Sequence, residues 1–513
     1  MLARLFTAAV NGLNACPVEV QVDVRPGSEI RMVGLPDSAV RESITRIFPA
    51  LKNSDYHYPG GMHTVVNLAP ADLRKEGTGY DLPIALGMLA AIEAVDASRL
   101  PRFIVVGELG LDGALRPIRG ALPIAIKARQ LGYEGLIVPQ ENVREAAVVN
   151  QLHVYGADHL RTVVDFFNGK ETMQPTEVNT REEFFAKQRE FPFDFAEVRG
   201  QEPVKRALEV AAAGGHNVLL IGSPGCGKSM MAKRLPSILP PLSLAESLET
   251  TQIHSVAGKL GQDSSLIATR PFRSPHHTIS DVALIGGGSN FQPGEISLAH
   301  HGVLFMDELP EFSRSALETL RQPLEDRRIT VSRAKYTIDL PCSFMLVASM
   351  NPCPCGYYNH PTRRCACLPG QIQRYMNKVS GPLLDRIDIQ VMVTPVPFAD
   401  LSQAPEGASS HTIRERVVAA RHIQEQRFAN EPHVHCNAQM TSRMLQTFAQ
   451  PDPSGYDRLQ TAMKRLDLSA RAYERILKVA RTIADLEGAP TIQTAHIAEA
   501  IGYRNLDRGS WGE

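Results

Sequence analysis

The stretch Gly222-Ser-Pro-Gly-Cys-Gly-Lys-Ser229 has the spacing of a phosphate-binding loop, G-x-x-x-x-G-K-S. Its glycines let successive backbone N–H groups turn toward phosphate oxygens, and the positive N-terminal end of the following helix adds to the attraction. Lys228 would neutralise the outer phosphates, and the Ser229 hydroxyl would bind Mg²⁺. We therefore predict an ATP-phosphate site made of Gly222, Ser223, Pro224, Gly225, Cys226, Gly227, Lys228 and Ser229.

Two acidic residues, Asp307 and Glu308, follow the apolar run Val303-Leu-Phe-Met306. A buried strand can end in carboxylates where a bound cation compensates their charge, as a Mg²⁺–phosphate group does. We predict that Asp307 holds Mg²⁺ through its water shell and that Glu308 polarises the attacking water. The alternative for either carboxylate alone is a helix N-cap. With the phosphate loop, the pair predicts ATP hydrolysis, which depends mainly on positioning and charge neutralisation.

The segments around these motifs predict an α/β fold. Asn217-Val-Leu-Leu-Ile221 and Gly302-Val-Leu-Phe-Met306 are continuous apolar runs, which are typical of buried parallel strands. Composition changes at two polar stretches, and residues 413–429 and 470–487 have helical spacing. We predict an N-terminal domain over 1–169, a linker over 170–193, an α/β core over 194–395 and a helical domain over 396–513.

Composition limits the classes of partner. The 513 residues include 54 Lys+Arg and 55 Asp+Glu, a net charge of −1 that excludes a basic coat over the whole surface. Any site for a polyanion must therefore be local. No apolar run approaches the roughly 20 residues that a membrane helix needs. The apolar start is short and is broken at Asn11-Gly12, so we expect no export signal and a cytoplasmic location.

These motifs resemble those of the AAA+ ATPases, specifically the magnesium-chelatase-like branch, and almost the whole chain is similar to the YifB/ComM family of competence-associated proteins. The resemblance implies an AAA+ P-loop core with a helix-2 insert at 271–294, a hairpin before sensor 1 at 328–338 and a helical lid. It also implies an ATP-driven helicase that promotes branch migration during natural transformation and homologous recombination. Its partners would be single-stranded, duplex or branched DNA and recombination proteins.

The resemblance also assigns roles to three residues. Asn351, after the apolar run that begins at Val347, is similar to sensor 1 and would bind the γ-phosphate or the attacking water. Arg386 is similar to an arginine finger that reaches the ATP of a neighbouring subunit, and Arg471 to sensor 2 on the phosphates. A finger acting in trans implies a ring, and the resemblance suggests a hexamer. The alternative for Arg386 is an ordinary ion pair with Asp385 or Asp388.

The hairpin at 328–338 is the predicted DNA contact. In related motors this element lines the central pore and grips DNA. Arg328, Arg333 and Lys335 would project toward phosphates while Ile329, Val331 and Tyr336 pack, although a solvated hairpin face is the alternative. Six copies would give a basic pore without changing a near-neutral total charge.

Four of the eight cysteines lie within fifteen residues: Cys353, Cys355, Cys365 and Cys367. Four thiolates suffice for tetrahedral Zn²⁺, although C-x-C pairs are tighter than the usual C-x₂-C. Redox-labile thiols or a ligand from His360 are alternatives, and a reducing cytosol disfavours disulfides. We predict a structural zinc site that braces the loop between Asn351 and Arg386.

Residues 1–169 resemble a Lon-type proteolytic domain of the α+β class. A Lon-type enzyme needs a serine nucleophile and a lysine base. The corresponding positions are Gly79 and Ile124, so we predict a non-proteolytic platform for ring assembly or for DNA. An ATP-dependent protease is therefore disfavoured. A chelatase-like subunit that drives metal insertion and an assembly chaperone acting on protein complexes remain the alternatives to a DNA motor.

Overall fold

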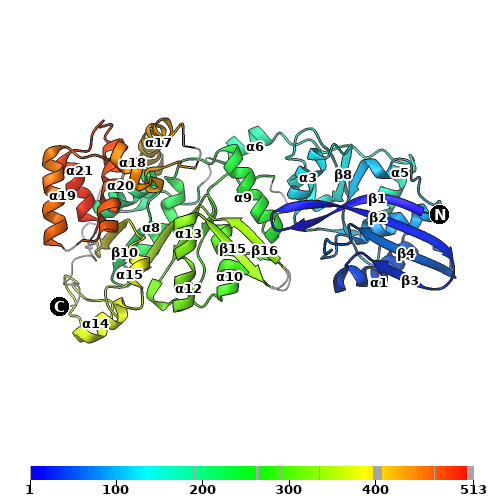
Figure 1. The fold of residues 1–513 in the computed structure, drawn as a ribbon, viewed down its shortest axis with the longest axis horizontal. Helices are drawn as coiled ribbons and strands as arrows, with labels where there is room; N and C mark the ends of the chain where they lie inside the picture. Colours follow the sequence, from blue (N-terminus) through cyan, green and yellow to red (C-terminus); the bar gives the residue numbers. More distant parts are fainter. Residues whose placement is uncertain are drawn as a thin grey trace. The chain divides into compact units, whose positions relative to one another are not determined.

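The computed structural model describes residues 2–188, 191–261, 265–288, 291–333, 336–396, 407–431, 433–466 and 468–504. The chain divides into two compact units (Figure 1). The first comprises Met1–Lys187, Ser243–Ala268 and Gly288–Pro293, and the second comprises Gln188–Leu242, Thr269–Gly287 and Gly294–Glu513. Within the described ranges, no helix is both long enough and apolar enough to cross a membrane.

The first unit is built on a mixed seven-stranded sheet with strand order β3-β4-β2-β1-β5-β8-β9. Apolar and polar residues alternate along the interior strand β2, where Val18, Val20 and Val22 are fully buried, as the period of two predicts. The strands are β1 (Leu2–Asn11), β2 (Asn14–Pro26), β3 (Ile30–Val33), β4 (Met62–Ala69), β5 (Phe103–Val105), β8 (Gly135–Pro139) and β9 (His153–Ala157), with short β6 (Glu108–Leu109), β7 (Leu115–Arg116) and β13 (Gln292–Pro293).

Helices cover this sheet. One of them, α2, is apolar on all sides, and every one of its residues is buried. The helices are α1 (Ser38–Asn53), α2 (Asp81–Ala91), α3 (Ala121–Gln130), α4 (Val143–Ala146), α5 (Leu160–Phe167), α6 (Thr180–Lys187) and α9 (Leu244–Ala257).

Two of these helices lie in places that the sequence patterns did not indicate. Helix α6 forms inside the segment 170–193, because Phe184 is buried and Glu183 accepts from the Ser265 hydroxyl at 2.8 Å. Helix α9 comes from the predicted core segment but packs against α3, and its Ser255 hydroxyl donates to the buried Glu145 of α4. The domain boundaries and the linker stay predictions.

The second unit contains a five-stranded parallel sheet with order β11-β14-β17-β10-β18. The predicted strands are present as β10 (Val218–Gly222) and β14 (Val303–Met306), and both are buried along their length. The remaining elements up to residue 396 are α7 (Glu202–Gly214), α8 (Lys228–Arg234), β11 (Phe272–Arg273), α10 (Asp281–Ile285), β12 (Gly286–Gly287), α11 (Glu295–Leu298), α12 (Arg314–Thr319), α13 (Arg321–Asp326), β15 (Arg328–Arg333), β16 (Tyr336–Pro341), β17 (Met345–Met350), α14 (Pro369–Met376), α15 (Gly381–Leu384) and β18 (Ile389–Val393).

The described residues after 407 form helices, as their spacing predicts. Helices α17 and α20 pack against each other (Figure 1). Both also pack against α7, where Gln424 of α17 donates to the carbonyl oxygen of Ala213 at 3.1 Å. The role of these helices as a lid stays a prediction. They are α17 (Ser410–Arg427), α18 (Ser442–Phe448), α19 (Pro453–Arg465), α20 (Ala470–Leu486) and α21 (Thr494–Gly502).

A buried carboxylate joins α20 to the sheet. Asp388 accepts from Arg475 Nη1 at 2.8 Å and from the backbone N–H of Asn217 at 3.2 Å, and its Oδ2 lies 3.3 Å from His216 Nδ1. Burial opposes ionisation, but the guanidinium of Arg475 and the contact with His216 hold the pKa of Asp388 well below its usual range. The ionised carboxylate therefore stabilises the folded state.

We expect Asp388→Asn to lower the free energy of unfolding by about 3–5 kcal/mol at pH 7, because Arg475 loses its partner inside the protein. Because the pKa of Asp388 is lower in the folded protein, its ionisation stabilises the fold at pH values above the unfolded pKa of about 3.9. This contribution is lost as the pH falls through the folded pKa. The difference between wild type and variant should therefore shrink as the pH falls below about 4. Urea unfolding followed by circular dichroism measures it, with the exposed Asp457→Asn as the control. Equal unfolding of both variants at pH 7 would contradict the prediction.

Candidate nucleotide-binding site

The phosphate loop connects β10 to α8, as predicted. Gly225 and Gly227 have φ angles of 79° and 95°, a conformation that suits glycine. A Cβ at Gly222 would lie 2.3 Å from the carbonyl oxygen of Val393 on the adjacent strand. The glycines are thus required by the backbone path of the loop.

Lys228 lies under this loop and is buried. Its Nζ donates to the carbonyl oxygens of Gly222 at 2.6 Å and Ser223 at 3.0 Å, and to Asn351 Oδ1 at 3.2 Å. Burial lowers the pKa of Lys228. The predicted sensor residue and the phosphate-binding lysine are therefore in direct contact.

The carboxyl ends of three neighbouring strands bring the metal-binding groups together. Ser229 Oγ donates to Asp307 Oδ2 at 2.8 Å. A hydroxyl and a carboxylate in contact are oxygen ligands of the kind Mg²⁺ prefers, so the residues present fit the predicted ion. Ser349, which the motifs did not identify, donates to the other carboxylate oxygen of Asp307 and accepts from the N–H of Glu308 at 3.3 Å.

Glu308 adopts a left-handed conformation with φ of 55°, and 56% of its side chain is exposed. Its Oε2 lies 3.8 Å from His277 Nδ1, a second residue that the motifs did not identify. A cavity of about 380 Å³ lies between the phosphate loop, Asp307 and Asn351. Glu308 and Asn351 also border an adjacent cavity of about 450 Å³, on the side of α14. The carboxylate of Glu308 therefore borders both cavities beside the phosphate loop.

The two predicted arginines lie elsewhere in this unit. Arg386 precedes β18, whose Ile389 pairs with Val218 at the start of β10, whereas the phosphate loop follows the end of β10. The two places are separated by the length of a five-residue strand, roughly 13 Å. Arg386 is buried and pairs with Glu325, not with Asp385 or Asp388. Arg471 is 63% exposed and lies 3.9 Å from Asp385, at this same end of the sheet.

The predicted hairpin is present as β15 and β16, which pair antiparallel from Arg328 opposite Pro341 to Arg333 opposite Tyr336. Ile329 and Val331 are buried, as expected. Arg328 and Arg333 are exposed. Lys335 lies outside the described residues.

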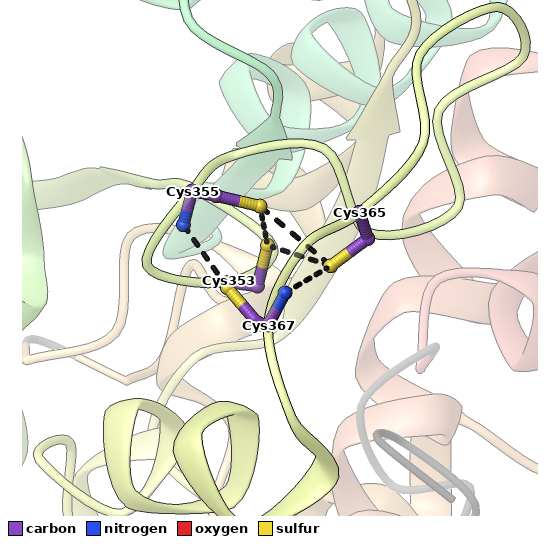
Figure 2. Close-up of side chains that lie close together, drawn as sticks. All are labelled: Cys353, Cys355, Cys365 and Cys367. Atoms are coloured by element: carbon purple, nitrogen blue, oxygen red, sulfur yellow. Dashed lines mark hydrogen bonds between the residues drawn. The ribbon is translucent and has the colours of Figure 1, made fainter.

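The four clustered cysteines come together (Figure 2). Cys353 Sγ lies 3.3 Å from Cys355 Sγ and 3.7 Å from Cys365 Sγ, and all four sulfur atoms lie within 4.8 Å of one another. Zn–S bonds of about 2.3 Å in a tetrahedron place sulfur atoms about 3.8 Å apart. The geometry fits zinc with these four ligands. His360 is outside the cluster, because its Nδ1 accepts from the N–H of Arg363 at 3.0 Å.

The thiols of the cluster differ in acidity. Desolvation raises the pKa of the buried Cys353 to about 12. Desolvation acts in the same direction on Cys355, but the backbone N–H groups of Ala366 and Tyr357 donate to its sulfur and lower its pKa to about 6. Cys355 is thus more readily ionised than Cys353, and the thiolate is the form that binds a metal.

The parallel sheet, the phosphate loop, the acidic pair and Asn351 define a P-loop nucleotide-binding site of the magnesium-chelatase-like AAA+ class. Three family models match the chain: Subunit ChlI of Mg-chelatase over residues 18–142, Magnesium chelatase, subunit ChlI, over 194–401, and Magnesium chelatase, subunit ChlI C-terminal, over 407–504. The first match falls on the segment that resembles a Lon-type domain, and that resemblance stays a prediction.

Full-length relatives identify the group more closely. The Salmonella typhimurium protein YifB is 44% identical over 509 residues, which cover 99% of this chain and 98% of the relative. The Haemophilus influenzae competence protein ComM is 43% identical over 510 residues, with the same coverage. The magnesium-chelatase 38 kDa subunit of Rhodobacter capsulatus is 27% identical over 179 residues, 31% of this chain and 50% of that protein. The chain belongs to the YifB/ComM family of magnesium-chelatase-like AAA+ proteins, and this membership indicates an ATPase.

Proposed function

We propose that the protein is an ATP-hydrolysing ring motor that acts on DNA, as a helicase promoting branch migration during natural transformation and homologous recombination. The observation that carries the proposal is the hairpin β15–β16 with its exposed arginines, in the same unit as the assembled ATP site. The name of the Haemophilus influenzae relative, competence protein ComM, supports the biological setting.

In the proposed ATP cycle, Lys228 and the loop backbone bind the phosphates. Ser229 and Asp307 would hold Mg²⁺, which would neutralise phosphate charge when bound. Glu308 accepts a proton from the attacking water, and Asn351 orients that water or the γ-phosphate. The contacts of Lys228 with Asn351 and of Ser229 with Asp307 support this division of roles.

The positions of two arginines support the proposed ring. Arg386 and Arg471 lie at the end of the sheet opposite their own phosphate loop, so we propose that both reach ATP held by the next subunit. Arg386 Nε is buried and has no hydrogen-bond partner among the described residues, so one donor of this guanidinium is unused within the single chain. A closed ring of such contacts is heterologous, and the family resemblance suggests six subunits.

Removal of two basic groups from the hairpin tests the DNA contact. We expect Arg333→Ala with Lys335→Ala to weaken DNA binding by at least tenfold, to reduce its salt dependence and to abolish DNA stimulation of ATP hydrolysis, because phosphate contacts release counterions. Binding titrations at several salt concentrations and unwinding of a synthetic four-way junction measure this. Arg458→Ala with Lys464→Ala, two exposed residues of α19, removes the same charge and should leave both activities unchanged.

A chelatase-like subunit or an assembly chaperone is the second candidate, favoured by the three magnesium-chelatase models that together span most of the chain. The same experiment separates the candidates. If wild-type protein hydrolyses ATP but DNA neither binds nor stimulates it, the DNA motor is excluded and remodelling of a protein complex is favoured.

A further inference from the structure

The cysteine loop begins and ends at the ATP site. Asn351 lies two residues before Cys353, and Cys367 lies two residues before α14. The buried Tyr375 on that helix borders the same cavity as Asn351, and the backbone N–H of Asn351 acts on its hydroxyl. The metal-binding loop therefore runs from the residue that contacts Lys228 to a helix whose Tyr375 lies beside that residue.

The same loop touches the phosphate loop directly. Gly356 has a φ of +82°, and its N–H donates to the carbonyl oxygen of Cys353 at 2.9 Å. A Cβ at Gly356 would lie 2.5 Å from Cδ and 2.9 Å from Cγ of Pro224. Contacts this short cannot form, so any side chain at position 356 would displace the ring of Pro224 or the cysteine loop.

We propose that the four-cysteine loop is a positioning device for the ATP site, which holds Pro224 through Gly356 and Asn351 through Tyr375 only while the cysteines bind their metal. The proposal rests on the proposed ATPase function. A bound ion ties two short segments, 353–355 and 365–367, into one rigid unit. Without it, the four thiols are linked by weak contacts alone, and both walls of the phosphate site can shift.

Nucleotide binding without turnover tests the role of the metal. We expect wild-type protein purified under reducing conditions to contain one zinc per chain. Its chelator-treated form and Cys365→Ser with Cys367→Ser should bind a fluorescent ATP analogue at least tenfold more weakly. Zn²⁺ should restore the affinity of the chelator-treated wild type and not that of the variant. Metal-free protein with wild-type affinity, or purified protein without zinc, would overturn the proposal.

Substitutions at the contacts test the mechanical link while the metal stays bound. We expect Gly356→Ala to retain zinc but to lose about tenfold in nucleotide affinity, and Pro224→Ala in that background to recover part of the loss. Gly488→Ala is the matched control, because Gly488 also has a positive φ of 67° but a Cβ there meets nothing within 4 Å. If Gly356→Ala and Gly488→Ala weaken nucleotide binding equally, the cause is general backbone strain. That result would overturn the proposed contact between Gly356 and Pro224.

Tyr375→Phe tests the contact of Tyr375 with Asn351 separately from the contact of Gly356 with Pro224. The variant should retain zinc and nucleotide affinity but lose about tenfold in kcat, because Asn351 loses the neighbouring hydroxyl while the phosphate loop is unchanged. A change in KM alone would overturn a positioning role. Lys228→Ala distinguishes failure of this inference from failure of the proposed function: if it binds ATP normally, the ATP site itself is wrongly assigned.

Discussion

Glu308→Gln should bind ATP with wild-type affinity and hydrolyse it at least 10²-fold more slowly. A glutamine keeps the size and hydrogen-bonding reach of the side chain but cannot accept a proton from water, and general bases contribute about 10²–10⁴-fold to rates. Glu308 is the exposed member of the acidic pair, whereas Asp307 is held by the hydroxyls of Ser229 and Ser349. Phosphate release and equilibrium binding of a fluorescent analogue measure the two quantities separately.

The neighbouring Glu311→Gln is the control for this prediction. Glu311 forms a 3.0 Å ion pair with Lys378, is 44% exposed and carries the same charge. We expect that variant to keep more than half of the wild-type rate. If Glu308→Gln also does so, the base is a different group, and His277 would be the next residue to substitute, because it lies 3.8 Å from Glu308.

The phosphate loop and its flanking elements could be predicted because their information is local. Glycines at fixed spacing allow one backbone path, and the apolar runs before Gly222 and Asp307 each specify a buried strand. The hairpin was implied by the family resemblance, and its alternating residues lie as expected: Ile329 and Val331 are buried and Arg328 is exposed.

Ser349 could not be predicted, because its role comes from the pairing of two strands distant in sequence. Met306 pairs with Ala348, so Asp307 and Ser349 follow on adjacent parallel strands. A serine within an apolar strand gives no signal of that register. Helix α9 is a similar case, since its contact with α3 joins segments more than a hundred residues apart.

The arginines of α20 show the limit of a motif match. Arg471 and Arg475 are one turn apart, and the motif alone does not say which of the two faces the sheet. Arg475 is 20% exposed and donates to Asp388, whereas Arg471 is largely exposed beside Asp385. The rotation of α20 about its own axis decides which arginine faces the sheet. Burial of residues such as Ile476 and Ile483 sets that rotation.

Arg386→Ala should reduce ATP turnover by about 10³-fold or more while leaving nucleotide binding intact, which is the effect of removing an arginine finger. The substitution also breaks the ion pair with Glu325, so Glu325→Gln is the matched control. We expect Glu325→Gln to keep most of the wild-type rate. Equal losses in both variants would assign the effect to the ion pair.

Mixing two inactive variants decides whether Arg386 acts between subunits. Lys228→Ala subunits retain Arg386 but cannot bind ATP, and Arg386→Ala subunits bind ATP but lack the finger. In rings assembled from equal amounts, about a quarter of the interfaces pair an intact phosphate loop with an intact arginine, so activity should return to that order. If Arg386 acted on its own subunit's ATP, no interface in the mixed ring would be complete, and the mixture would stay inactive. The position of Arg386, a strand's length from its own phosphate loop, favours the first result.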